Sequence, residues 1–559
     1  MIGTIQHLLN SSDVLTTVLS LFILLYIIVL IILHGKMKSN EKSATAWNIL
    51  CFVPLVFSLI HMAVFCSGYA FLVIMSNCIS IYLPSVMIAF FPLLAKKKPI
   101  KIVGDVICIA LSFVLSVLSL ANGKMANYSG QSMSEAYISL CDYLEKNYVS
   151  SEWKNINYET LRADGLALIR EAEKTGDTDK YYEALFRLVD SFHDGHMALF
   201  SHGTEYSYEL ENIKKFGDYG LSLITLDNGD TIAVNTVDNI EIKDGDIITK
   251  WNGVPVKEAI DSVSLPVATG TTLENERIYK TFYLAGVGGE TAEVTYIDTD
   301  GVEFTAILKK IDAEMPRAFD SLNLFTCARN EGYEYRMLSD NIGYLRVPAE
   351  ETNEFSDMLS YVTGDHKIAR EMFREDLREL KAQGMTKLVI DIRNNMGGYD
   401  EVATALTSLF TKEEMYAFSL GVKKGAELKS VDDRYVLADG EFSDMDVLVL
   451  TNMNCASAGD GLTLYMSRLP NVTVAGLTDP MGINQETGGC VFMPENAVIC
   501  FPTGLILDEN GDPNIDIDDT RQSRDPVEVK IPLDKDAALK IFSGEDYELE
   551  WAVDHLNDH

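Results

Sequence analysis

The chain has 559 residues, 47% of them hydrophobic, and a formal net charge of −36. A single hydrophobic core seldom grows beyond about 300 residues, so this length predicts several domains. The strong negative charge repels phosphate groups, which excludes nucleic acid as the expected partner. The acidity is segregated, because the only acidic residues within 1–121 are Asp13, Glu41 and Asp105.

Four apolar runs, at about 14–34, 48–67, 70–94 and 102–121, dominate this first part. Each is close to the ~20 residues that a helix needs to cross a bilayer. Lysines lie between the first two runs (36–42) and between the last two (96–101), and the positive-inside rule puts such loops in the cytoplasm. We therefore expect a four-helix transmembrane region (1–121), the lipid bilayer as a partner, and a multi-pass location in the cell membrane. The amino terminus and everything after Asn122 are then expected outside the cytoplasm.

The cysteines after residue 122 are five in number and have no close-pair spacing: Cys141, Cys327, Cys455, Cys490 and Cys500. Zinc ligands usually come in such close pairs, so we expect no metal site. The spacing does not assign any disulfide. No pattern for an organic cofactor is present either, and we expect none.

A polar, glycine- and serine-containing linker (122–133) leads into a region, 134–212, where apolar residues recur every three or four positions. This period predicts helices. From 213 to 311 short strand-like runs such as GLSLITL, TIAVNTV and GDIITKWNG alternate with turn residues. This part, with its opening Gly220–Leu221 loop, resembles a PDZ domain. The resemblance implies that it binds an extended peptide and holds the peptide's carboxylate on the amides of that loop. A plain β module without a ligand is the alternative.

The remainder, 312–545, alternates strands and helices and is followed by a short tail, 546–559. IGYLRVP, KLVIDIRNN, DVLVLTNMN and VTVAG are strand-like, and the segments between them have helical periodicity. Such alternation predicts βαβ units with a mainly parallel sheet, where chemistry gathers at the carboxyl ends of the strands. DIRNNMGG (391–398) and NCASAGD (454–460) both lie at such ends.

Ser457, between two alanines at a strand-to-helix turn, is a candidate nucleophile. The N–H of Ala458 and the positive end of the helix would face charge developing on a bound carbonyl. The alternative is structural, because Ser457 and Asp460 have the S-x-x-D spacing of a capping box. In DIRNNMGG, two glycines after a strand let the backbone approach a ligand closely and free N–H groups for a second oxyanion contact.

The two motifs together, D-x-R-x-N-x-G-G and, some 60 residues later, A-S-A before a V-x-G strand, resemble the tail-specific or C-terminal-processing family of serine peptidases. The resemblance spans about 134–540. It implies Ser457 as the nucleophile, with Ala458, Gly397 and Gly398 supplying oxyanion amides.

The better-known branch of that family uses a Ser–Lys dyad, but this chain has no lysine from 430 to 529. The other branch, which resembles the tricorn core protease, uses Ser, His and Glu, with the histidine in an L-x-D-G-H motif before the PDZ-like part. LVDSFHDGHMAL matches that place, which implies His196 as the general base. His193 falls outside the D-G-H pattern and is expected at a helix end.

The same branch has its acidic triad member some 50–60 residues after the serine, where this chain reads LILDENGDPNID. Aligning Asp516 with the family aspartate implies Glu509 as the residue that orients the imidazole, with Asp508 as the alternative. An ordinary acidic β-turn is also open.

The expected architecture is thus multidomain: an α-helical transmembrane bundle, an α/β protease core with a mainly parallel sheet, and a β-rich PDZ-like domain. The expected function is a membrane-anchored serine endopeptidase acting on polypeptides that the PDZ-like domain could capture by their carboxyl tails. Two alternatives stay open: a non-catalytic pseudoprotease that binds peptides, and a hydrolase of a non-peptide ester or amide. The sequence does not indicate an oligomeric state.

Overall fold

The computed structural model describes residues 52–53, 55–56, 124–201, 212–266, 270–328, 332–352, 367–424 and 427–558. Within these residues no helix has both the length and the apolar character needed to cross a bilayer, which contradicts the expected multi-pass location in the cell membrane. The four apolar runs of the sequence lie almost entirely outside the described residues.

A six-stranded, mainly parallel sheet forms the middle of the described chain, in the order β18-β15-β14-β11-β10-β9. The strands are β9 (Glu334–Met337), β10 (Ile342–Arg346), β11 (Lys387–Asp391), β14 (Asp446–Leu450), β15 (Val472–Gly476) and β18 (Val529–Lys530). Only β9 is antiparallel to its neighbour. Asp391 pairs with Leu450, so DIRNNMGG and NCASAGD leave adjacent strands at the same edge. This confirms the expected α/β core.

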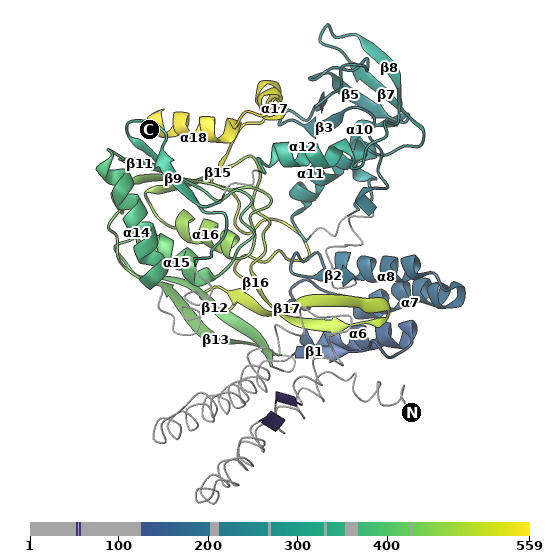
Figure 1. Ribbon diagram of the computed structural model, residues 1–559, viewed down its shortest axis with the longest axis horizontal. Helices are drawn as coiled ribbons and strands as arrows, with labels where there is room; N and C mark the ends of the chain where they lie inside the picture. Colours follow the sequence, from purple (N-terminus) through teal and green to yellow (C-terminus); the bar gives the residue numbers. More distant parts are fainter. Residues whose placement is uncertain are drawn as a thin grey trace, which may run out of the picture.

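Helices cover both faces of this sheet because alternate strand residues point to opposite sides. Leu388 and Ile390 pack with α14 (Lys367–Ala382), α15 (Asp400–Ser408) and α16 (Ala458–Ser467). Val389 lies in a second core with α17 (Lys535–Phe542) and α18 (Tyr547–Asp558). Figure 1 shows α14, α15 and α16 grouped on one side of β9, β11 and β15, and α17 with α18 on the other side.

The segment 213–311 forms an antiparallel sheet in the order β3-β4-β5-β7-β8, with β6 beside β5. Its strands are β3 (Ser222–Thr225), β4 (Thr231–Val234), β5 (Ile247–Trp251), β6 (Val254–Pro255), β7 (Thr291–Ile297) and β8 (Glu303–Lys309). The accompanying helices are α10 (Val256–Asp261), α11 (Leu273–Leu284) and α12 (Arg317–Phe325). The β-rich architecture agrees with the sequence pattern, and the PDZ-like identity stays a prediction.

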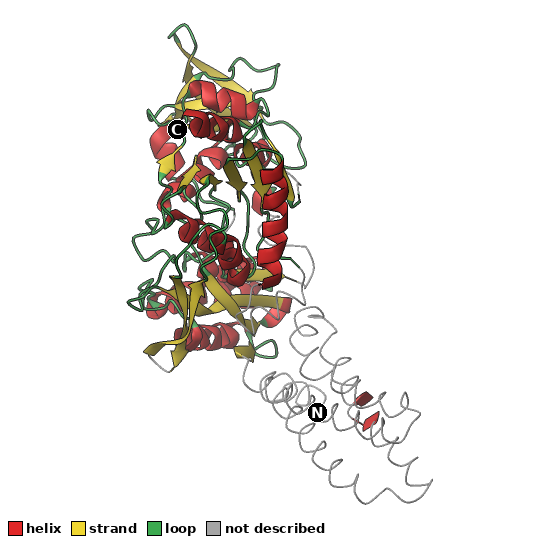
Figure 2. Cartoon of the chain, turned by 90° about the vertical axis from the view of Figure 1, so that its left-hand side faces the viewer, coloured by secondary structure: helices red, strands yellow, loops and turns green. Residues whose placement is uncertain are grey.

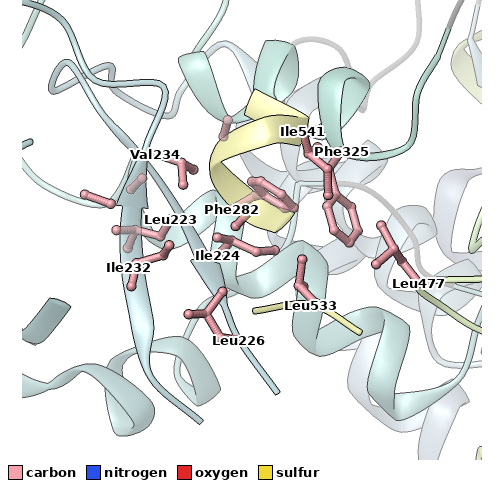
Figure 3. Close-up of a cluster of buried hydrophobic side chains, with 14 of the residues drawn as sticks. Leu223, Ile224, Leu226, Ile232, Val234, Phe282, Phe325, Leu477, Leu533 and Ile541 are labelled. Carbon is pink, nitrogen blue, oxygen red and sulfur yellow. The ribbon is translucent and has the colours of Figure 1, made fainter. Parts of the chain in front are cut away.

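This β-rich unit shares a hydrophobic core with the parallel-sheet unit. Phe282 of α11 packs on Phe325 (ring centroids 5.6 Å apart) and on Phe542 of α17 (6.2 Å). Figure 3 shows Phe282 and Phe325 between strand residues of the β-rich unit and Leu477, Leu533 and Ile541 of the core. These apolar contacts hold the β-rich unit against the parallel-sheet unit.

A third six-stranded sheet, which the sequence did not predict, joins distant segments: β1 (Lys124–Asn127), β2 (Ala198–Ser201), β12 (Met415–Lys424), β13 (Glu427–Val436), β16 (Gln485–Phe492) and β17 (Ala497–Leu507). A short 3-10 turn, η2 (Pro494–Asn496), links β16 to β17. The predicted helical region is present as α6 (Met133–Asn147), α7 (Tyr158–Thr175) and α8 (Thr178–Asp190), which pack on this sheet. Figures 1 and 2 show this layer at one end of an elongated molecule. Because β2 pairs with β17, the sheet brings the segment after His196 next to the C-terminal third of the chain.

Candidate active site

Ser457 stands in the turn between β14 and α16 with an unusual backbone conformation. Its φ of 58° and ψ of −128° lie where residues with a side chain are rarely found. Such strain persists only when the surroundings impose it, and it is frequent at functional sites. The Ser457 side chain makes no capping hydrogen bond to α16, so the capping-box alternative is wrong.

Asp460, the other half of that supposed capping box, holds a neighbouring loop instead. Its Oδ2 accepts the N–H groups of Gly482 (2.8 Å) and Ile483 (2.9 Å). The N–H of Ser457 donates to the carbonyl oxygen of Ile483 at 2.7 Å. Burial raises the pKa of the Asp460 carboxyl well above its usual range. Hydrogen bonds made by both Ser457 and Asp460 therefore hold the serine turn against the loop 481–484.

Gly397, the first glycine of the pair in DIRNNMGG, lies directly against Ser457. Gly397 has φ +102°, and a Cβ added there would lie 2.5 Å from Ser457 Cβ and 3.0 Å from Ala458 N. The N–H of Gly397 donates to Asn395 Oδ1 at 2.8 Å and is already engaged. The amides that can face a bound carbonyl are thus those of Gly398, which lines the cavity, and of Ala458, the first residue of α16.

Glu350 anchors this glycine loop through both its backbone and its side chain. Its N–H donates to Gly397 O (3.2 Å), and its carbonyl accepts from Tyr399 N (2.9 Å). Its Oε1 accepts from Asn395 Nδ2 at 2.8 Å, whereas its buried Oε2 has no partner in the described part of the chain. Burial raises the pKa of the Glu350 carboxyl to about 8. The raised pKa favours the protonated form of the carboxyl group that holds this loop.

His196 lies in the turn between α8 and β2. Asp194 fixes its backbone, since the His196 N–H donates to Asp194 Oδ1 at 2.8 Å. The glycine of the D-G-H motif packs closely on the loop 481–484, because a Cβ on Gly195 would lie 2.3 Å from the Cδ1 of Ile483. The motif thus packs against the same loop that is bound to Ser457.

The imidazole of His196 is paired with an amide side chain. His196 Nδ1 lies 2.6 Å from Gln485 Oε1 at the start of β16, so Nδ1 carries the proton and Nε2 is left to act as a base. Gln485 is 3% exposed, and its Nε2 donates to Asp194 Oδ2 at 3.5 Å. Tyr148 also donates to that oxygen, at 2.6 Å. Gln485 therefore connects the imidazole to a buried carboxylate.

Ser457, His196, Gln485 and Gly398 line a single cavity of about 660 Å³. The cavity opens between the start of α15, the turn before α16, and strands β12, β13, β16 and β17, which belong to one sheet. A serine, a histidine with a fixed tautomer and two amides around one cavity can carry out nucleophilic acyl transfer.

Residues 341–519 match the family model described as Peptidase family S41. The chain contains a Peptidase family S41 domain. It is accordingly a serine-type peptidase. No curated protein sequence matches the chain.

Several solved structures resemble this peptidase over most of its length. Mature CPAF complexed with lactacystin is 13% identical with a TM-score of 0.49, covering 75% of this chain and 96% of CPAF. The photosystem II D1 C-terminal processing protease is 15% identical with a TM-score of 0.32, covering 74% and 98%. The tricorn protease is 13% identical with a TM-score of 0.34, covering 76% and 36%.

The acidic residues expected beside His196 lie elsewhere in this peptidase. Glu509 is exposed in the turn that follows β17, and Asp508 accepts the turn amides of Asn510 (2.8 Å) and Asp512 (2.9 Å). Asp516 is buried and pairs with Lys154 at 2.8 Å. Gln485 occupies the place beside the imidazole that the resemblance implied for Glu509.

His193 faces a separate cavity, of about 550 Å³, between α8 and the β-rich unit. Burial lowers the pKa of its imidazole to about 4. The structure therefore separates His193 from Ser457.

The predicted peptide-binding loop of the β-rich unit is already occupied. Gly220 donates its N–H to Asp218 Oδ1 at 2.7 Å, and the same oxygen accepts from Arg317 Nε at 3.2 Å. Leu221 is 1% exposed. A carboxylate of the chain itself thus takes the Gly220 amide that was expected to hold the carboxylate of a peptide.

The sequence reasoning missed Gln485 as a site residue. The available signal was its position: it lies 28 residues after Ser457, in the stretch GLTDPMGINQETGG where the lysine of the other branch was sought. An uncharged amide was not expected there, because the resemblance implied a base or an acid.

Proposed function

We propose that this peptidase cleaves polypeptides with Ser457 as nucleophile and His196 as general base, and that Gln485 takes the orienting role expected of Glu509. The observation that carries the proposal is one cavity shared by the strained Ser457 turn, His196 and Gly398. The amides of Gly398 and Ala458 are proposed to stabilise the oxyanion, whereas Gly397 acts by close packing.

In the first half-reaction, His196 Nε2 takes the proton of Ser457 Oγ while Oγ attacks the substrate carbonyl carbon. The C–N bond then breaks, and the same proton passes to the departing amine. Water attacks the acyl-enzyme with His196 again as base, which releases the new carboxyl terminus and restores the serine. The Gln485 carbonyl accepts from Nδ1–H throughout and so holds the imidazole in the required tautomer, as an asparagine does in papain-like proteases.

The proposal does not include capture of a substrate's carboxyl tail at Gly220 and Leu221. The contact between the Gly220 amide and Asp218 argues against it, since a second carboxylate would have to displace the first. Substrate recognition is proposed to take place in the cavity around Ser457.

A fluorophosphonate probe tests the proposal, because it labels only an activated serine. We expect labelling of the wild type that is lost in Ser457→Ala and in His196→Ala. The matched control is His193→Asn, since His193 faces a different cavity and has φ of 45°, which asparagine tolerates. This control should be labelled like the wild type. A folded wild type that is neither labelled nor able to cleave an unfolded protein would favour the pseudoprotease alternative.

A further inference from the structure

Carboxylates crowd the cavity around Ser457. Asp400 and Glu401 open α15, directly after the Gly398–Tyr399 pair, and Asp432 and Glu486 enter the lining from β13 and β16. One guanidinium, that of Arg434, is the cationic counterpart among the residues that line this cavity. The lining therefore carries an excess of negative charge next to the candidate nucleophile.

Arg434 neutralises part of this charge but does not reach Asp400. It lies 2.6 Å from Asp432 Oδ2 and 3.6 Å from Glu401 Oε1. Asp400 Oδ1 accepts instead from two uncharged donors, Tyr465 Oη (3.1 Å) and Asn484 Nδ2 (3.0 Å). Within the described ranges no cationic side chain forms an ion pair with Asp400. The Asp400 carboxylate is thus oriented by neutral groups and lacks a counter-ion.

Burial makes ionisation of these carboxyls costly. It raises the pKa of Asp400 to about 6, and burial together with the charge of Asp400 raises the pKa of Glu401 to about 7. A cation bound beside them would relieve this cost, because an opposite charge within a few ångströms favours the ionised form. The helix dipole of α15 also favours acids at these positions, but it does not require them to face a cavity.

The rest of the wall suits the stem of a long cationic side chain. Phe418 and Leu420 from β12 and Ile506 from β17 line the cavity, and Phe418 stacks on Tyr465, the residue that orients Asp400. Lysine and arginine lay their methylene groups along such apolar surfaces while the charged end reaches polar partners. An apolar wall that leads to a carboxylate without an ion-pair partner among the described residues therefore fits a lysine or arginine side chain.

We propose that this cavity selects peptide substrates with a lysine or arginine next to the scissile bond, and that Asp400 receives the cationic end. The inference rests on the proposed function of Ser457 and His196 in the same cavity. Asp400 is a specificity-determining residue, since it would contact the substrate side chain without taking part in bond breaking.

A pair of quenched fluorescent peptides that differ only by arginine or citrulline at that position tests the proposal. Citrulline has the shape of arginine without its charge, so the ratio of the two kcat/KM values reports the charge contact alone. With the full-length wild type we expect kcat/KM for the arginine peptide to exceed that for the citrulline peptide by about tenfold or more, the effect of one good polar contact in a specificity site. Asp400→Asn should bring the ratio close to one, and the exposed matched control Glu414→Gln should leave it unchanged.

The pH dependence of the arginine-to-citrulline ratio, measured with the wild type, gives a second test that needs no variant at Asp400. Since Asp400 gains its charge as the pH rises through about 6, the arginine-to-citrulline ratio should increase between pH 5 and pH 7. The other ionisable groups that face it are Glu401, Asp432, Glu486, Arg434 and Tyr465. An effect of pH on the catalytic step itself changes the rates of both peptides alike and cancels in the ratio.

The outcomes separate the two proposals. Fluorophosphonate labelling with a ratio near one at every pH, or a ratio that Asp400→Asn does not change in a folded protein, overturns the specificity proposal and leaves the proposed function standing. Absence of both labelling and cleavage in the folded wild type overturns the two together.

Discussion

Gly397 and Ser457 lie so close that a single methyl group on the glycine would place two Cβ atoms 2.5 Å apart. The contact is made by the glycine loop after β11 and the serine turn after β14, which leave adjacent strands at the same sheet edge. The relative position of the candidate nucleophile and of the Gly398 amide depends on this contact.

We therefore expect Gly397→Ala to lower kcat/KM by about 100-fold or more, because displacing an oxyanion donor usually has an effect of this size. Its φ of +102° adds backbone strain to the steric conflict. The rate of fluorophosphonate labelling measures the effect without a substrate. Gly289→Ala is the matched control, since a Cβ there meets no atom within 4 Å. Labelling of Gly397→Ala at the wild-type rate would show that the contact is not needed.

The pairing of Gln485 with Asp194 predicts that a carboxylate cannot replace the amide. Gln485→Glu would put two carboxylates 3.5 Å apart in a buried site, where like charges repel strongly. We expect kcat to fall about tenfold or more, by loss of the imidazole's orientation. Adding Asp194→Asn exchanges the two groups and should recover part of the loss.

A double-mutant cycle measures this recovery, with Gln485→Ala plus Asp194→Asn as the control pair that cannot restore it. The expected coupling is about 1 kcal/mol or more in favour of the exchanged pair. Purely additive effects on kcat would contradict the assigned contact.

Features that depend on local sequence patterns could be predicted, whereas features that depend on contacts between distant segments of the chain could not. The parallel sheet was predictable because β10, β11, β14 and β15 are short buried apolar runs with helical segments between them, a local pattern. The sheet that contains β1 and β16 was not, because these strands pair across more than 360 residues (Met125 with Cys490) and no periodicity encodes that contact. Gln485 was missed because an uncharged amide was not expected beside the imidazole, and its contact with His196 also depends on the position of β16 in this sheet.

The two motifs were recognised from their sequence pattern, but the contacts of their side chains differ from those expected. Arg393 of DIRNNMGG does not line the cavity; it binds Asp391, Asp546 and Glu548 and so holds α18 on the sheet. Asp460 had the spacing of a capping residue, yet its carboxylate binds the loop amides of Gly482 and Ile483. Spacing along the chain identified these side chains, whereas their partners depend on segments that are far away in sequence.

The buried Glu350 predicts a pH-dependent stability. Burial, reinforced by the negative charges of Asp400 and Glu351, raises its pKa from 4.5 to about 8, so between these values the folded state holds a proton that the unfolded state has released. Stability contributed by this group is therefore lost as the pH rises from about 5 to 8, by about 1 kcal/mol per pH unit. Glu350→Gln keeps the neutral form at every pH and should remove this slope.

Melting curves of the wild type and of Glu350→Gln between pH 5 and pH 9 check this expectation. The variant should gain in stability relative to the wild type with each pH unit up to about 8, the pKa of Glu350, and the difference should then level off. Glu414→Gln, a change of the same kind at an exposed position, should follow the wild type throughout. Parallel curves for wild type and Glu350→Gln would mean that Glu350 is ionised in the folded protein.

Cys490 and Cys500 face each other on β16 and β17, and their sulfur atoms lie 2.6 Å apart. Both are buried, at 9% and 6% exposure. We expect glutathione disulfide to oxidise them to a disulfide: the two thiols lose two hydrogens and two electrons, and the oxidant becomes two glutathione thiols. Intact mass should fall by about 2 Da, and closing a loop of about ten residues should stabilise the fold by about 2–3 kcal/mol.

Cys490→Ser should abolish both effects, whereas Cys141→Ser should leave both in place. An unchanged mass in the folded wild type after treatment with the oxidant would rule the bond out.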